Sequence, residues 1–196
     1  MIHRCRRMVL LLMCFTTAVV ATSMSPGELI ELGVTRLTKQ MLTQRAMLEL
    51  DTEKLYALVD RELGPHLAVS KIARLVVGRH WKKATQAQQE EFTVSFRRLL
   101  IKTYAASIFE HVAEAKIEFK PFSIKKHSRT AIVRTLIRFD DGSKLPIDYK
   151  LFLGSEGQWL IYDVLISRLS LVINFRNSYG RIVESGGFDA LLELLR

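Results

Sequence analysis

The stretch QWLIYDVLISRLSLVINFR, residues 158–176, decides the fold of this chain. It predicts a β-strand that leads into a helix beginning near Ser170. With a strict period of two, the two faces of the strand carry Leu160, Tyr162, Val164 and Ile166 on one side and Trp159, Ile161 and Leu165 on the other. Strands of small antiparallel sheets normally have one apolar and one solvated face. We therefore expect this strand to lie in the centre of a sheet, or to have its outer face covered by a terminal helix.

Three further strands are predicted before this stretch: KIEFKPF at 116–122, TAIVRTLIRF at 130–139 and KLPIDYKLFL at 144–153. The links DDGS and GSEG, at 140–143 and 154–157, are short and rich in turn residues, which indicates antiparallel hairpins. The sequence thus predicts a four-stranded antiparallel sheet.

Helices are predicted on both sides of these strands. Apolar residues at helical spacing fill 26–50, and two shorter helices follow, one ending at Gly64-Pro65 and one at Gly78. Thr85 and Gln88 form a capping-box pattern that starts a long helix to about residue 110. The helix after Ser170 should stop at 186–187, before a short last one. The predicted fold is α+β, a curved sheet with helices packed on its concave face.

The N-terminus has the pattern of an export signal. Arg4, Arg6 and Arg7 precede an apolar run from Met8 to Val20, which is short for a membrane span, and small residues follow. We predict cleavage after Ala21, which leaves 22–196 as a single domain; a retained N-terminal anchor is the alternative. The chain's two cysteines lie inside the predicted signal, so the mature chain would have no disulfide and no cysteine metal site.

The mature chain is moderately basic. Without the three arginines of the predicted signal, 26 of the 29 basic residues remain against 20 acidic ones, a formal charge of +6. This balance favours anionic partners. Export, and the absence of a basic run interleaved with aromatic residues, argue against nucleic acid.

Catalytic and metal-binding patterns are weak. His66, His80, His111 and His127 match no zinc spacing, and Ser170 lies in no nucleophile-elbow pattern. Asp148 and Asp163 lie in adjacent predicted strands and are the only candidates for general acid–base chemistry. The chain is therefore predicted not to be an enzyme and to need no cofactor. An enzyme acting on a small apolar substrate through these two carboxylates remains an alternative.

Apolar side chains are abundant where the sheet and the helices should face each other. The helix at 86–110 and the helix after Ser170 would form one wall. Val133, Ile137, Ile147, Tyr149 and Leu165 would form the other. If the walls stand apart they enclose a cavity for apolar ligands; if they touch they form a filled core, as in an interaction module without a ligand. Periodicity alone leaves both open.

Three stretches are specific together: VDRELGPHLAVSKIARLVVGRHWKKATQAQQEEFTVSFRRLLIKTY at 59–104, GQWLIYDVLISRLSLVINFRNSY at 157–179 and the SGGFDALLELL ending. Through them the chain resembles the periplasmic phospholipid-binding proteins of the Mla pathway, the MlaC or toluene-tolerance family. The resemblance covers nearly all of the predicted mature chain.

This resemblance implies an NTF2-like cone that holds phospholipid tails between sheet and helices, with the headgroup outside. It also implies a monomeric carrier that shuttles lipid between an outer-membrane lipoprotein–porin complex and an inner-membrane ABC transporter with a lipid-binding domain. Tyr104 and Leu169 match pocket positions of the family; the other expected contacts come from periodicity. The predicted lipid-binding residues are Tyr104, Ile108, Val133, Ile137, Ile147, Tyr149, Leu165, Leu169, Val172 and Phe175.

One departure from the family concerns Ser167 and Arg168, which stand where the family usually has Glu-Gly. A guanidinium can pair with phosphate oxygens in a bidentate manner, so Arg168 is a candidate headgroup contact. The departure also leaves open a relative that carries another apolar lipid, such as a hopanoid.

Overall fold

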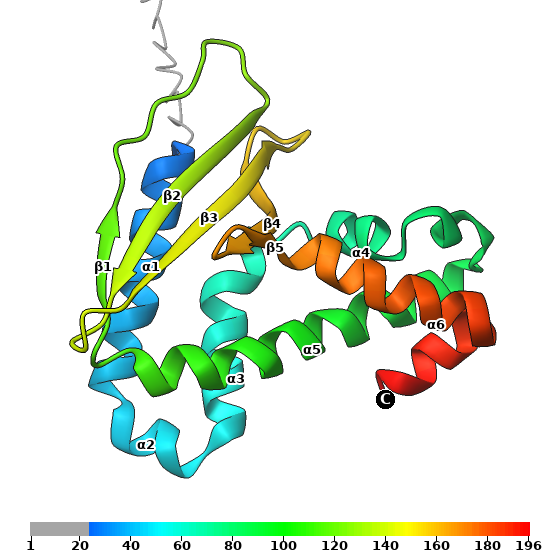
Figure 1. The fold of residues 1–196 in the computed structure, drawn as a ribbon, viewed down its shortest axis with the longest axis horizontal. Helices are drawn as coiled ribbons and strands as arrows, with labels where there is room; N and C mark the ends of the chain where they lie inside the picture. Colours follow the sequence, from blue (N-terminus) through cyan, green and yellow to red (C-terminus); the bar gives the residue numbers. More distant parts are fainter. Residues whose placement is uncertain (1–23) are drawn as a thin grey trace, which may run out of the picture.

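The order of elements is helices first, an antiparallel sheet second and a helix last, as the sequence predicts (Figure 1). The computed structural model describes residues 24–196, so the predicted signal peptide lies outside the described residues. The elements are α1 (Pro26–Thr43), α2 (Arg45–Leu50), α3 (Thr52–Leu63), the 3-10 helix η1 (Gly64–His66), α4 (Val69–Val77), the 3-10 helix η2 (Gly78–Lys83), α5 (Gln86–His111), β1 (Lys116–Phe119), β2 (Thr130–Arg138), β3 (Lys144–Leu153), β4 (Trp159–Ile166), β5 (Leu169–Ser170) and α6 (Leu171–Leu194). None of the helices within 24–196 is long and apolar enough to cross a membrane.

Local sequence sets most helix boundaries. The predicted capping box of Thr85 and Gln88 starts α5, with the Gln88 backbone N–H donating to Thr85 Oγ1 and the Gln88 side chain accepting from the Thr85 N–H. The predicted helix at 26–50 is in fact two helices. Gln44, between α1 and α2, leaves the helical region with φ −105° and ψ 15°, while its N–H still reaches the Gln40 carbonyl.

The sheet has five strands in the order β1-β2-β3-β4-β5, all antiparallel. The four predicted strands are present, and the prediction of four missed β5, because a strand of two residues leaves no periodicity. Ser167 and Arg168 form the two-residue turn between β4 and β5, with φ values of +49° and +69°. Positive φ at both central residues is the geometry of a type I′ hairpin turn.

A β-bulge in β4 explains why this strand looked apolar on both faces. Leu151 of β3 pairs with Ile161, whereas Lys150 pairs with Asp163, so Tyr162 is an extra residue. The alternation changes phase at this point, and Ile161, Val164 and Ile166 all lie on the helix-covered face of the sheet. On the helix-covered side β4 thus presents Ile161, Val164 and Ile166. Asp163, which pairs with Lys150 of β3, points its carboxylate away from these residues and is buried by its contacts with Ser170 and Val172.

Helices α1, α3 and α5 lie under one face of the sheet, and the long helix α5 continues past the sheet to pack with α4 and α6 (Figure 1). Three clusters of buried side chains follow this layout. One joins α1 to β2, β3 and β4, one joins α1 and α3 to α5, and one joins α4, α5 and α6. The space where the three clusters meet is only partly filled.

Candidate functional site

A cavity of about 330 Å³ lies between the sheet and the helices. This volume is within the range of small-molecule sites and well above that of a single water. The helical walls come from α1, α3, α4, α5 and α6, and the opposite wall comes from β1 to β4. Most lining residues are apolar, so the cavity is suited to a ligand with hydrocarbon chains rather than to a polar metabolite. Because the sheet and the helices enclose this cavity, they do not form the filled core that was the alternative prediction.

An aromatic cluster closes the cavity at its α4–α6 end. Phe96 and Phe175 line the cavity and meet edge to face, with their ring centroids 5.1 Å apart. Behind them Phe92 stacks on Phe96 at 5.4 Å, and Tyr179 meets the Phe92 ring at 6.1 Å. Such aromatic pairs pack rigidly and leave little free volume. The hollow is therefore confined to the half of the molecule under the sheet.

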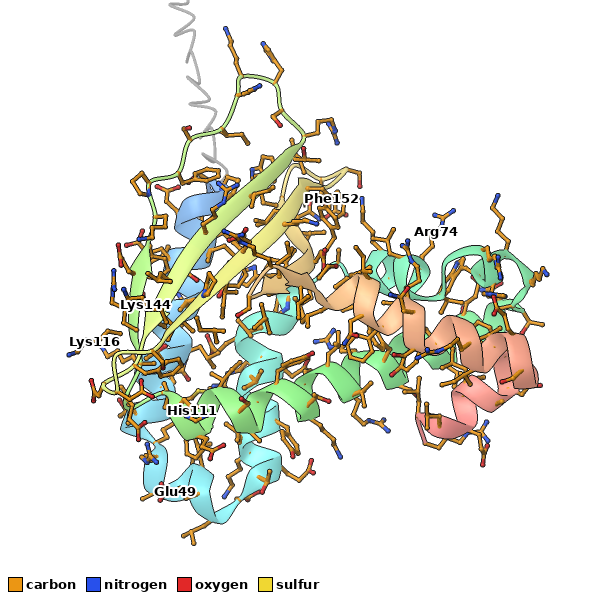
Figure 2. The ribbon with its side chains drawn as sticks, viewed as in Figure 1. Glu49, Arg74, His111, Lys116, Lys144 and Phe152 are labelled. Carbon is orange, nitrogen blue, oxygen red and sulfur yellow. The ribbon has the colours of Figure 1, made fainter. Side chains whose placement is uncertain are left out.

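At the other end, α5 meets the edge of the sheet. The His111 ring lies 5.8 Å from the Phe139 ring, edge to face, and both residues line the cavity. Figure 2 shows His111 in the last turn of α5, at the end of the sheet where Lys116 and Lys144 begin β1 and β3. Ser107, Ile108 and His111 are exposed although they line the cavity, so the hollow reaches the surface along α5.

Seven of the residues expected from the sequence lie in the cavity lining. They come from α5, from three neighbouring strand positions and from α6: Tyr104, Ile108, Ile137, Ile147, Tyr149, Val172 and Phe175. The strand register brings the sheet residues together. Ile147 pairs with Ile166 and Tyr149 pairs with Val164, so these four side chains lie on one face of the sheet. Their contact with lipid remains a prediction.

Three expected wall residues lie elsewhere. Val133 is on the inner face but is packed under α1 with Leu29 and Ile30, and it is only 2% exposed. Leu165 lies beyond the bulge and therefore on the outer face, opposite Asp148 of β3. Leu169, in β5, is 73% exposed and does not reach the cavity.

Arg168 does not lie at the cavity either. It is exposed in the β4–β5 turn and is not among the lining residues. The Ser167 N–H is bonded to the Pro146 carbonyl of β3 at 3.0 Å, which holds the start of the turn against β3. The geometry therefore gives no support to Arg168 as a headgroup contact.

The two candidate carboxylates are engaged in structural contacts. Asp163 Oδ1 accepts from the Val172 backbone N–H at 3.2 Å, and Oδ2 accepts from Ser170 Oγ at 2.8 Å and from Lys150 Nζ at 3.2 Å. Asp148 lies 3.7 Å from Arg134 on the outer face. Asp163 is the only carboxylate among the lining residues, and its oxygens face β5 and the start of α6. This pair does not form an acid–base site in the cavity.

Tyr104 and Tyr149 bring phenol hydroxyls to the apolar lining, and both remain uncharged at neutral pH. Burial raises the pKa of Tyr104. Burial also raises the pKa of Tyr149, and a hydrogen bond with Thr135 offsets part of this effect. A neutral hydroxyl in an apolar wall can hydrogen-bond an ester or alcohol oxygen of a ligand without introducing charge.

The α1 and α3 walls were not predicted from the sequence. Ile30, Val34 and Leu37 follow one helical stripe in α1, and all three line the cavity, as does Leu63 of α3. A stripe of this kind predicts burial but cannot tell a packed core from a cavity wall. Within the described residues no group of three or more His, Asp or Glu side chains could hold a metal ion.

Comparisons with known proteins agree on one family. The family model described as MlaC protein matches residues 33–196. Toluene tolerance protein ttg2D of Pseudomonas putida is 22% identical over 190 residues, covering 96% of this chain and 87% of the relative. The intermembrane phospholipid transport system binding protein MlaC of Haemophilus influenzae is 21% identical over 178 residues, covering 90% of this chain and 82% of that protein.

A solved structure shares the fold. The phospholipid-binding protein from Ralstonia solanacearum, in complex with a phospholipid, superposes with a TM-score of 0.77 at 25% identity, covering 85% of this chain and 92% of that chain. With the family model spanning residues 33–196, which hold the whole cavity except Leu29 and Ile30, the chain belongs to the MlaC family.

Proposed function

We propose that this protein binds a phospholipid, with its acyl chains in the cavity, and carries it between the inner and outer membranes. The observation that supports this proposal most strongly is the apolar hollow between sheet and helices in a chain whose fold neighbour binds a phospholipid. Removing hydrocarbon from water is worth about 0.8 kcal/mol per methylene, so acyl chains alone supply a large binding free energy. No chemical step is needed for such transport.

The proposed setting is the periplasm, reached through a signal peptide cleaved near Ala21, with residues 22–196 acting as one monomeric domain. The proposed partners are an inner-membrane ABC transporter with a lipid-binding domain and an outer-membrane lipoprotein–porin complex. A relative is named for intermembrane phospholipid transport, which supports this setting. The net positive charge would assist encounters with anionic headgroups and acidic partner surfaces.

Mass spectrometry of the purified mature protein, native and after organic extraction, tests the proposal. Phospholipid in the extract, bound to the folded protein, is the expected result. A hopanoid or another apolar lipid would keep the carrier and change its cargo. A protein that is empty and takes up no offered lipid would overturn the proposal.

Two tryptophan variants of β2 test whether the cavity is the site. Ile137 lines the cavity, whereas Ile132, in the same strand, is 42% exposed on the outer face. Ile137→Trp should fill the cavity and lower the amount of retained lipid, while Ile132→Trp should retain as much as the unmodified protein. Far-ultraviolet circular dichroism of both variants checks that the fold is intact. Equal retention by both variants would place the lipid elsewhere.

A further inference from the structure

A second hollow, which we call the α1–β1 groove, lies beside the cavity. It has a volume of about 470 Å³ and is bordered on the helix side by Val34, Thr35, Thr38, Lys39, Leu42 and Thr43 of α1, and on the other side by Ala115, Ile117 and Phe119. Figure 1 shows α1 running along the β1–β2 side of the sheet, away from the α4–α6 end. The groove is therefore distant from the β4–β5 turn that carries Arg168.

The α1–β1 groove adjoins the cavity. Val34 and Thr38 of α1, together with Ala115 and Ile117 before and within β1, line both hollows. All four side chains are small or medium-sized and none is charged. Among the described residues these four border both hollows, so a ligand that occupies both would pass beside their side chains.

The α1 wall of the groove changes from apolar to polar in the outward direction. Residues four apart lie on one ridge of a helix. The ridge of Val34, Thr38 and Leu42 begins at the cavity, because its first two members also line the cavity. The neighbouring ridge consists of Thr35, Lys39 and Thr43, which border the groove alone and are exposed. This change in polarity along the groove wall matches that along a phospholipid, from its acyl chains to its ester and phosphate oxygens.

Within residues 24–196, Lys39 is the only Lys or Arg that lines either hollow. No carboxylate within residues 24–196 lies within 4.0 Å of its ammonium group. The hydroxyl of Thr43 donates to the Lys39 carbonyl at 2.8 Å, which leaves the Thr35 hydroxyl as the nearby ridge donor. An unpaired ammonium next to an apolar route is suited to a phosphodiester, since charge-assisted hydrogen bonds are the strong ones.

We propose that the α1–β1 groove is the mouth at which the phosphodiester headgroup of the bound lipid lies, with Lys39 as its phosphate contact. The acyl chains pass between Val34 and Thr38 on one side and Ala115 and Ile117 on the other, and enter the cavity. This inference rests on the proposed function, because it assigns a position to the phospholipid that the cavity is proposed to hold.

Headgroup position is measured with phosphatidylcholine that carries a nitroxide on its choline group. The predicted mature chain has no cysteine, so a single bimane label can be placed at Leu42→Cys, on the groove, or at Leu169→Cys, next to Arg168. Both side chains are exposed, which keeps the substitutions compatible with folding. We expect the headgroup nitroxide to quench the bimane fluorescence more strongly at Leu42→Cys than at Leu169→Cys. Equal or greater loss at Leu169→Cys would overturn the inference while leaving lipid binding intact, and a protein that retains no lipid would overturn the proposed function as well.

The role of Lys39 is measured by affinity. Lys39→Met keeps the aliphatic stem and removes the charge, and Arg36→Met is the control, since Arg36 is an exposed cation of α1 that does not line the groove. Lys39→Met should weaken binding of phosphatidylglycerol about tenfold, or about 1.4 kcal/mol. It should leave diacylglycerol with the same chains, which lacks phosphate, unaffected. An unchanged affinity for phosphatidylglycerol, or an equal loss for both lipids, would overturn the assignment of Lys39.

Discussion

Asp163 accepts a hydrogen bond from the backbone N–H of Val172 at 3.2 Å, which ties β4 to the first turn of α6. Ser170 completes the junction, since its hydroxyl donates to Asp163 at 2.8 Å and accepts from the Ile173 N–H at 3.1 Å. A carboxylate at a helix N-terminus satisfies free N–H groups and interacts favourably with the helix dipole. Because Val172 lines the cavity, this junction also fixes one of its walls.

Replacing Asp163 by alanine should therefore destabilise the domain. The variant leaves the Val172 N–H without its acceptor and removes the buried partner of Lys150, so we expect a loss of about 3 kcal/mol in the free energy of unfolding. Urea unfolding measures this loss. Asp148→Ala is the control, because Asp148 faces Arg134 at 3.7 Å on the more exposed outer face and should change stability by less than about 1 kcal/mol. Similar losses in both variants would contradict the anchoring role of Asp163.

Gly187 divides α6 into two arms. Its φ of +77° and ψ of −178° lie in a region that is essentially restricted to glycine. The bend returns the last arm toward α5, where the Phe188 ring meets the Phe92 ring at 5.9 Å and Leu191 is fully buried. The bend thus supplies part of the cluster that closes one end of the cavity.

Two glycine-to-alanine substitutions in α6 should have opposite effects. Gly187→Ala should lower the free energy of unfolding by roughly 1–3 kcal/mol, because alanine is strained at this φ and ψ. Gly180→Ala should raise it by roughly 0.5–1 kcal/mol, because Gly180 is helical and an added Cβ would meet nothing within 4 Å. Thermal unfolding of both variants measures the difference. An unchanged or raised stability of Gly187→Ala would show that the bend at Gly187 does not require glycine.

The sequence predicted the helices and strands, but it did not predict for every strand residue which face of the sheet it lies on. Thr85, Gly78 and the links at 140–143 and 154–157 are local signals, and each marks a boundary that the structure confirms. The bulge at Tyr162 has no such signal, because an extra residue in an apolar strand leaves the composition unchanged. Leu165 was therefore assigned to the wrong face.

Cavity-lining residues were predicted less well where contacts between elements decide which side chains are covered. Helix α1 covers Val133, and nothing in β2 alone indicates which of its inner residues will be covered. Leu169 was expected in the pocket from the family resemblance, but its place in the two-residue strand β5 exposes it. Ile137, Ile147 and Tyr149 were placed on the inner face by plain alternation, which holds because β2 and β3 pair without a bulge.

Tyr179 should make the domain sensitive to alkali. Burial, with a smaller contribution from Tyr104, raises the pKa of Tyr179 from 10.0 to about 12. The folded state therefore favours the protonated phenol, and this stabilisation is fully present below pH 10 and is lost as the pH rises from 10 to about 12. Two pKa units correspond to about 2.7 kcal/mol, as an order of magnitude.

Tyr179→Phe should reduce this alkaline loss of stability and change little at neutral pH. Urea unfolding of the variant and the unmodified protein at neutral pH and above pH 10 measures the two slopes. Some alkaline loss should remain, because burial also raises the pKa of Tyr104 and Tyr149. Curves that stay parallel over the whole range would mean that Tyr179 titrates normally in the folded state.

Arg168→Gly should stabilise the domain without weakening lipid binding. Arg168 has a φ of +69° in a two-residue hairpin turn, where glycine carries no steric penalty and other residues lose roughly 1 kcal/mol. Relief of this strain should raise the free energy of unfolding by about that amount. Lys144→Gly is the control, because Lys144 is exposed in the extended backbone of β3, where glycine should be slightly destabilising. Since Arg168 lies outside the cavity lining, affinity for phosphatidylglycerol should be the same in Arg168→Gly and the unmodified protein. A marked loss of affinity with unchanged stability would instead make Arg168 a phosphate contact and place the headgroup at the β4–β5 turn.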